Sequence, residues 1–159
     1  MPKIIQLQDN NKNKIYPKIK NDFMIINLNQ EQKNTTTNIF KVNFNNVVLS
    51  YGDGLEFYNN GIRIGKGIKK IRADLILWLE QTPSSYASFH IYKNGNEITY
   101  NLNQNTGAVW STANSFAFID VVEGDVIYAY VRFADANSTF NRISGFYNGS
   151  CNLAVQVIE

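Results

Sequence analysis

Cysteine and histidine are almost absent from this sequence of 159 residues, which contains only Cys151 and His90. One cysteine cannot form an intrachain disulfide, and one cysteine with one histidine is too few for a Cys/His metal site. Any Ser-His-Asp or Cys-His site would depend on His90, which lies between Phe89 and Ile91 in a predicted strand. An outward side chain on a strand is the ordinary explanation for such a histidine. We therefore expect no catalysis at His90, and we expect Cys151 to be a small buried side chain in a closing apolar strand.

Strong charge and long apolar runs are absent as well. The net charge is +2 and the sequence pI is about 8.6. The lysines are scattered, and the nearest approach to a basic cluster is Lys66, Lys69, Lys70 and Arg72. A protein that binds nucleic acid usually shows a basic stripe with interleaved aromatics, so these side chains more simply protect a solvated strand edge. No run approaches the length of a membrane-spanning helix, and the N-terminus lacks the apolar stretch of a signal peptide. We expect a protein that is made in a cytoplasm and binds neither nucleic acid nor a membrane.

The sequence is rich in residues that form strands and tight turns. Hydrophobic residues make up 44% of it and aromatic residues 13%, which suffices for a sizeable core. Asparagine-rich turns occur at 59–61 and 94–96, where asparagine tolerates the positive φ of tight turns. Short apolar segments, each ended by turn residues, lie at 39–44, 47–51, 55–58, 68–79, 86–93, 97–102, 115–122, 125–133 and 151–158. Many short strands without a convincing helical period predict an all-β sandwich or barrel.

Two parts of unequal size are expected along the chain. Residues 3–28 are predicted to form two or three short strands, with a turn at 9–13. Residues 29–38 are polar throughout and are the best candidate for a linker. We therefore expect an N-terminal segment of residues 1–38 that ends in this linker, followed by one β-domain of residues 39–159.

Alternation within the longer strands predicts the core. In the longest segment Ile71, Ala73, Leu75, Leu77 and Leu79 share one face, because successive strand residues point to opposite sides. The same pattern places on the core side the residues Ala87, Phe89, Ile91, Ile127, Ala129, Val131 and Phe133.

Two strands carry apolar or aromatic residues on the face that should be polar. These residues are Ile76 and Trp78 on one strand and Tyr128 and Tyr130 on the other. Exposed aromatic stripes usually mark an interface, so subunit contact is the favoured interpretation. The alternative is that they pack under the N-terminal segment of the same chain.

The run from Gly61 to Ile158 resembles the trimeric heads of the tumour-necrosis-factor and complement type. The matching pieces are a glycine turn into a long strand, a Lys-Asn-Gly turn, a Gly-Asp turn, the approach to the last strand and that closing strand. They lie at residues 65–73, 89–95, 121–128, 140–146 and 152–158. The resemblance implies an antiparallel jelly-roll β-sandwich that assembles as a homotrimer. It also implies that Tyr128, Tyr130 and Trp78 lie toward the threefold axis.

Residues 5–18 are similar to the openings of many tail-fibre and baseplate proteins from phages and prophages of Gram-positive bacteria. Those openings often read Leu-x-Asp-x-x-Gly-Asn-x-Ile-Tyr-Pro, and residues 7–9 and 15–17 match the two ends of that pattern. In that family the opening attaches the head to the virion or starts a stalk. The resemblance implies a virion location, other tail proteins as partners and a receptor-binding head.

Two loops carry the aromatic and amide side chains that bind sugars by stacking and by paired hydrogen bonds. The first is residues 103–110, which end in Trp110, and the second is residues 135–148, with Asn137, Asn141, Arg142 and Tyr147. These five residues are the predicted ligand site, and the expected ligand is a host cell-wall saccharide. The alternative is that Trp110 caps the sandwich and the amides only form turns.

The favoured hypothesis is thus a non-enzymatic tail-tip protein whose trimeric head binds a host-surface saccharide, without a metal or other cofactor. A structural virion protein without a ligand is the runner-up. An oxygen-only calcium site that includes Asp53 and Asp135 stays open, although the loops lack regular acidic spacing. A polysaccharide hydrolase would need two carboxylates facing a cleft, and the acidic residues lie mostly at turns.

Overall fold

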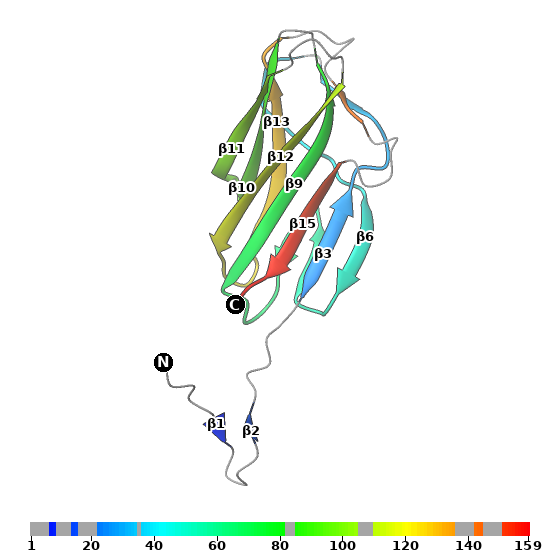
Figure 1. The fold of residues 1–159 in the computed structure, drawn as a ribbon. Coiled ribbons are helices and arrows are strands. Elements are labelled where there is room, and N and C mark those ends of the chain that lie inside the picture. The colour runs from blue at the N-terminus through cyan, green and yellow to red at the C-terminus, as the bar shows by residue number, and fades with distance from the viewer. Residues whose placement is uncertain are drawn as a thin grey trace.

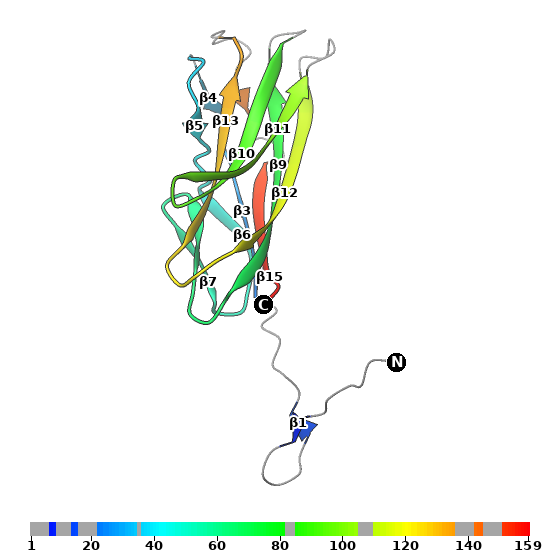
Figure 2. The same cartoon turned by 90° about the vertical axis from the view of Figure 1, so that its left-hand side faces the viewer.

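Two antiparallel β-sheets packed face to face form the body of the molecule (Figure 1, Figure 2). The computed structural model describes residues 7–8, 14–15, 22–34, 36–81, 85–104, 110–135, 142–144 and 151–159. Within these residues every regular element is a strand, and no helix is long and apolar enough to cross a membrane. A separate antiparallel pair is formed by β1 (Leu7–Gln8) and β2 (Lys14–Ile15).

The first sheet is built around the long strand β9 (Lys70–Glu80) and is called the β9 sheet below. One edge of β9 pairs over its whole length with β12 (Trp110–Asp120). The other edge pairs with β15 (Asn152–Val157) and, at its end, with β14 (Arg142–Ile143). Beyond β15 follow β3 (Phe23–Asn27) and β6 (Asn46–Tyr51), whereas β4 (Gln32–Lys33) pairs with β14.

The second sheet, called the β10 sheet below, covers one face of the first. Its strand order is β11 (Asn96–Gln104), β10 (Tyr86–Lys93), β13 (Val126–Phe133), β8 (Gly61–Ile64) and β7 (Leu55–Tyr58). The short strand β5 (Phe40–Lys41) also pairs with β13. The two sheets make the β-sandwich that the short apolar segments predict and the jelly roll that the family resemblance implies.

One core fills the space between the sheets, and the predicted alternation is confirmed. The five predicted core residues of β9, from Ile71 to Leu79, all have 0% of their surface exposed. The predicted core residues of β10 and β13 are buried as well. Both sheets thus contribute alternate residues of each strand to a shared apolar interior.

The predicted turns use asparagine and glycine in left-handed backbone conformations. Asn59 and Asn60 have φ values of 48° and 63° between β7 and β8. Asn94 and Gly95 have values of 51° and 85° between β10 and β11. Asparagine and glycine tolerate these angles better than other residues, so both tight turns predicted from the sequence are confirmed.

Asp125 joins two neighbouring turns of the sandwich. Its carboxylate accepts hydrogen bonds from Asn94 Nδ2 at 2.6 Å and from the Val122 N–H at 3.0 Å, and Lys93 Nζ lies 3.4 Å away. Burial alone would raise the pKa of Asp125, but these hydrogen bonds and the lysine charge outweigh it and lower the pKa. The Asp125 side chain therefore links the turn between β12 and β13 to the turn between β10 and β11.

The sandwich begins earlier than the expected boundary between residues 38 and 39. Strand β3 lies between β15 and β6, and its residue Ile26 is fully buried opposite Leu153. The polar run 29–38 is tied to the sandwich, because the Gln32 side chain donates to Lys41 O and accepts from the Asn43 N–H. Residues 22–34 thus belong to the sandwich. The sequence missed this because the side chains that hold the run in place are themselves polar.

The burial pattern makes a matched stability test possible with two valines. Val155 in β15 is fully buried, whereas Val122 is 66% exposed. We expect Val155→Ala to lower the free energy of unfolding by about 2–3 kcal/mol through lost burial and a cavity. Val122→Ala should change it by less than about 0.5 kcal/mol. Urea denaturation at one fixed protein concentration measures both, and equal effects would contradict the assigned core.

Candidate functional site

The structure brings together two residues that the sequence placed in separate loops. Trp110 and Arg142 lie on opposite sides of Glu80, the last residue of β9, with which both are in register. The Arg142 guanidinium carbon lies 5.9 Å from the centre of the Trp110 ring. The centres of the Trp110 and Trp78 rings are 5.3 Å apart. The contact between the two tryptophans was not foreseen from the sequence. The other three predicted site residues, Asn137, Asn141 and Tyr147, lie outside the described residues.

Arg142 is held by two carboxylates at this end of the sandwich. It forms an ion pair with Glu80, and its Nη1 atom lies 3.1 Å from Glu31 Oε2. The hydrogen bond to Glu80, with smaller contributions from both carboxylate charges, raises the pKa of Arg142. Both carboxylates are engaged by one guanidinium, which differs from the two substrate-facing carboxylates of a glycosidase. The cluster is suited to stacking and hydrogen bonding instead.

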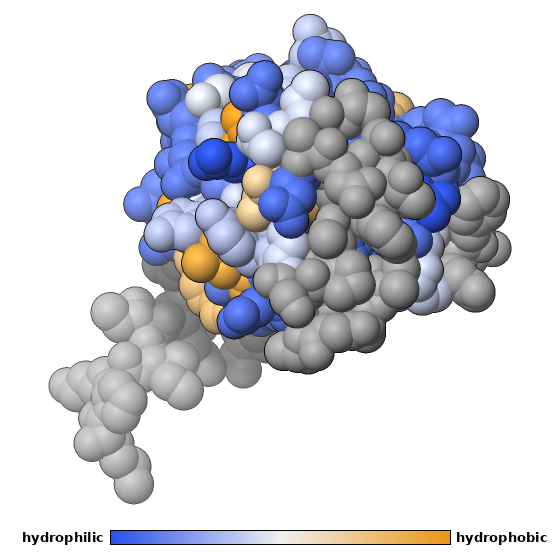
Figure 3. Space-filling model, turned by 90° about the horizontal axis from the view of Figure 1, so that it is seen from above, coloured by the Kyte–Doolittle hydropathy of each residue, from blue (hydrophilic) through white to orange (hydrophobic). Residues whose placement is uncertain are grey.

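The surface around this cluster is mixed. Viewed from the loop end, the described residues are mostly hydrophilic, with apolar groups in small separate patches (Figure 3). Trp110 is half-buried, and 25% of the Arg142 side chain is exposed. Trp110 therefore packs against Trp78 and leaves part of its side chain exposed to solvent.

The four predicted interface residues do not form one surface. Ile76 and Trp78 point outward from the β9 sheet, whereas Tyr128 and Tyr130 point outward from the β10 sheet. Because the sheets pack face to face, these outward faces lie on opposite sides of the sandwich. Tyr128 and Tyr130 therefore do not share a face of the protomer with Trp78, and the contact of all three at a threefold axis stays a prediction. Alternation identifies outward residues, but it does not tell which sheet a strand joins.

The two tyrosines also have partners within the chain. The Lys41 ammonium lies 3.9 Å from the centre of the Tyr128 ring, and the rings of Tyr130 and Tyr92 are 4.4 Å apart. Both tyrosines are half-buried. Their aromatic character is thus explained by packing on the outer face of the β10 sheet.

The most exposed aromatic residues beside Ile76 are two phenylalanines that the sequence analysis did not single out. Phe116 and Phe118 on β12 are 60% and 59% exposed, and Ile76 is 38% exposed. We call these three residues the β12 face. Both phenylalanines lie opposite the ion-paired residues Asp74 and Arg72 of β9. The signal was present, because Ala117 and Ile119 alternate with them toward the core.

A second apolar surface lies at the other edge of the same sheet. All six residues of β6 are exposed, and Val48, Leu49 and Tyr51 are exposed by 51%, 50% and 69%. Within the described residues β6 pairs with β3 alone. An edge strand with apolar side chains on both faces and no protecting lysine usually pairs with or packs against another chain.

Ser88, His90 and Glu97 form a hydrogen-bonded chain on the outer face of the β10 sheet. His90 Nε2 lies 2.9 Å from Ser88 Oγ, and Nδ1 lies 2.7 Å from Glu97 Oε2. This is the order of groups in a serine hydrolase, but such a site also needs N–H donors for the oxyanion. Strand β10 pairs on both sides, so the backbone N–H groups around Ser88 are used within the sheet. The described residues therefore do not complete an acyl-transfer site.

Cys151 is not a reactive thiol. It is 1% exposed, and its Sγ accepts from the Trp78 N–H at 3.1 Å. Burial raises the pKa of the Cys151 thiol to about 11. The prediction of a small buried side chain is confirmed.

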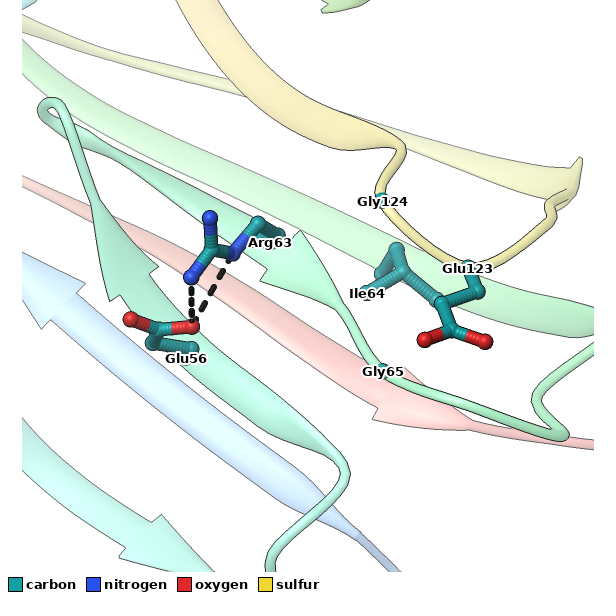
Figure 4. A pocket seen from close by; sticks show the side chains of 6 residues that line it. All are labelled: Glu56, Arg63, Ile64, Gly65, Glu123 and Gly124. Carbon is teal, nitrogen blue, oxygen red and sulfur yellow. Dashed lines mark hydrogen bonds and ion pairs between the residues drawn. The ribbon is translucent and has the colours of Figure 1, made fainter.

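A hollow at the β8 end is lined by Glu56, Arg63–Gly65, Glu123 and Gly124 and has a volume of about 320 Å³ (Figure 4). Arg63 is turned toward Glu56, to which its Nε donates at 2.9 Å, so the one cation of the hollow is already paired. The described residues contain no group of three or more Asp, Glu, His or Cys side chains that could hold a metal ion. The calcium site that the sequence left open around Asp53 and Asp135 gains no support from these residues.

The described architecture is that of an antiparallel jelly-roll β-sandwich of the tumour-necrosis-factor type, as the sequence pieces predicted. No family model matches the chain, and no curated protein matches it. Three crystal structures of murine APRIL, at pH 5.0, 8.0 and 8.5, are similar to it with TM-scores of 0.68, 0.66 and 0.65. The sequence identities are 10%, 10% and 11%, and each alignment covers 87% of this chain and 100% of the other. The likeness establishes the fold.

The ion pairs of Arg142 lead to a stability prediction. Arg142→Gln leaves Glu80, whose side chain is 6% exposed, without its charged partner. We expect the free energy of unfolding at neutral pH to fall by about 2 kcal/mol or more. Arg132→Gln is the matched control, since Arg132 is exposed and has no acidic partner among the described residues. The control should change stability by less than about 0.5 kcal/mol in urea denaturation. An unchanged Arg142→Gln protein would show that the ion pairs are not formed in solution.

Proposed function

We propose that the chain is a phage or prophage tail-tip protein whose trimeric jelly-roll head binds a saccharide on the host cell surface. The observation that carries the proposal is the β9 sheet, which has exposed apolar side chains at both of its edges on a jelly-roll head. The similarity of residues 5–18 to tail-fibre and baseplate openings supplies the virion context.

The two apolar edges support a closed ring of subunits. The β12 face lies at one edge of the β9 sheet and β6 lies at the other. When one surface of a copy contacts a different surface of the next copy, the interface is heterologous. Repeating this contact produces a ring if the rotation between neighbouring copies closes. A ring of three copies is the assembly implied by the resemblance to tumour-necrosis-factor heads. In this assembly Phe116 and Phe118 are contact residues that were not singled out from the sequence.

Saccharide binding is supported by the cluster at the end of β9. The exposed part of the Trp110 ring offers a stacking surface, and Arg142 offers hydrogen-bond donors beside it. Stacking and a few hydrogen bonds give a single site an affinity on the order of millimolar to micromolar. Three such sites on one trimer act together, so this affinity is enough to hold a virion by avidity. In this proposal the N-terminal segment before Asp22 attaches the head to other tail proteins. The protein is made in the host cytoplasm and becomes part of the virion.

A second candidate function has its own support in the structure. Arg142 is already satisfied by Glu80 and Glu31, and Trp110 already packs against Trp78. A cluster that is complete without a ligand suits a purely structural virion protein. The two functions differ in whether the protein binds host walls.

Depletion by intact host cell walls tests the proposal. We expect walls to remove the wild-type protein from solution. Trp110→Ala should reduce this depletion roughly tenfold, because stacking on one aromatic side chain contributes about 1–3 kcal/mol. Tyr58→Ala is the control, since Tyr58 is 43% exposed on β7 in the other sheet. Walls that deplete none of the protein favour the structural role. Release of reducing ends from the walls would show an enzyme instead.

A further inference from the structure

A hollow on the outer face of the β10 sheet contains polar groups that the proposed function does not use. It has a volume of about 370 Å³ and is lined by residues 37–39, Ser88, His90, Glu97 and Arg132. This is within the size range of small-molecule sites. It lies on the opposite face of the sandwich from the β12 face, so a ring formed through the β9 sheet leaves it accessible.

The hydrogen-bonded chain in this hollow fixes the role of Ser88. The Glu97 carboxylate accepts at His90 Nδ1, and the tautomer that carries its hydrogen on Nδ1 accepts at Nε2. Ser88 then donates its hydroxyl hydrogen to His90 Nε2 at 2.9 Å. The lone pairs of Ser88 Oγ remain as an acceptor for a ligand hydroxyl.

Arg132 supplies the complementary group. Its Nε donates to the Thr37 carbonyl oxygen at 3.0 Å, which holds the guanidinium at the edge of the hollow. Among the residues that the structure describes, no carboxylate pairs with it. A guanidinium with free terminal N–H groups binds a carboxylate through two parallel hydrogen bonds.

The acceptor and the cation are neighbours. Ser88 and Arg132 are directly opposite each other in the β10–β13 ladder, which places their Cβ atoms about 4.5–5.5 Å apart. We propose that the hollow binds the carboxylate and the adjacent hydroxyl of an acidic sugar residue. Arg132 binds the carboxylate, and Ser88 accepts a hydrogen bond from the hydroxyl. A hexuronic acid carries these two groups on neighbouring ring carbons.

An aromatic ring beside the hollow favours a sugar over an acidic peptide. One face of the Tyr100 ring stacks on His90, with centroids 5.7 Å apart at an interplanar angle of 27°. The Tyr100 side chain is nevertheless 58% exposed, so its other face is open to solvent. The apolar face of a pyranose ring packs against such a surface while its hydroxyls and carboxylate reach the polar groups.

Calorimetric titration of the full chain with an oligomer of glucuronic acid tests this site. We expect the oligomer to bind and the corresponding neutral glucose oligomer to bind much more weakly, with affinity that falls as salt rises. Arg132→Gln should weaken binding roughly tenfold or more, because it removes a charge-assisted hydrogen bond. Arg132→Lys keeps the charge but loses the planar guanidinium, so its affinity should lie between those of the wild type and Arg132→Gln. Ser88→Ala should weaken binding by less than Arg132→Gln.

Arg63→Gln is the matched control, because Arg63 also points outward from the β10 sheet but is paired with Glu56. This variant should leave the titration unchanged. Binding that is absent, that is equal for the neutral oligomer, or that survives Arg132→Gln would overturn the proposal. Competition by inorganic phosphate at the same concentration would overturn it too. Host walls that deplete the protein through Trp110 while glucuronate does not bind would refute this site and leave the proposed function standing.

Discussion

The pairing of β9 on both of its edges is the constraint on which the rest of the structure depends. Its inward residues form the centre of the core, and its register with β12 and β15 determines where those strands lie. The same register places Trp110 and Arg142 on either side of Glu80, although they are 32 residues apart in the numbering of the chain. It also turns Phe116 and Phe118 outward on the side where Ile76 is exposed. The loop-end cluster and the β12 face are thus two consequences of one ladder.

Much of this ladder is predictable from the sequence, because a strand has a period of two and its core face must be apolar. Ile71 to Leu79, Phe89 and Ile127 were assigned to the core by that rule alone, and all are buried. The turns at Asn59 and Asn94 were predictable from the residues that tolerate positive φ. The jelly roll itself came from the resemblance of residues 61–158 to tumour-necrosis-factor and complement heads.

What the sequence did not reveal is how strands combine across the chain. Nothing local shows that β9 and β13 belong to different sheets, so Ile76 and Tyr128 were grouped although they lie on opposite faces. Nothing local shows that β3 joins the β9 sheet between β15 and β6, because its partners Leu153 and Val47 are distant in the sequence. The chain from Ser88 through His90 to Glu97 was missed because it crosses a hairpin, where Glu97 comes to lie beside His90. Long-range pairing decides each of these sites.

The central claim is that the exposed apolar edges of the β9 sheet are covered by further copies of the chain. Light scattering coupled to size exclusion measures the mass of the purified protein in solution and tests this claim most directly. The account predicts a particle of three times the chain mass of 18.1 kDa that separates into single chains when Phe116 and Phe118 are both replaced by serine. A wild-type particle of 18.1 kDa would contradict it, because the phenylalanines and β6 would then be exposed to water in the functional molecule.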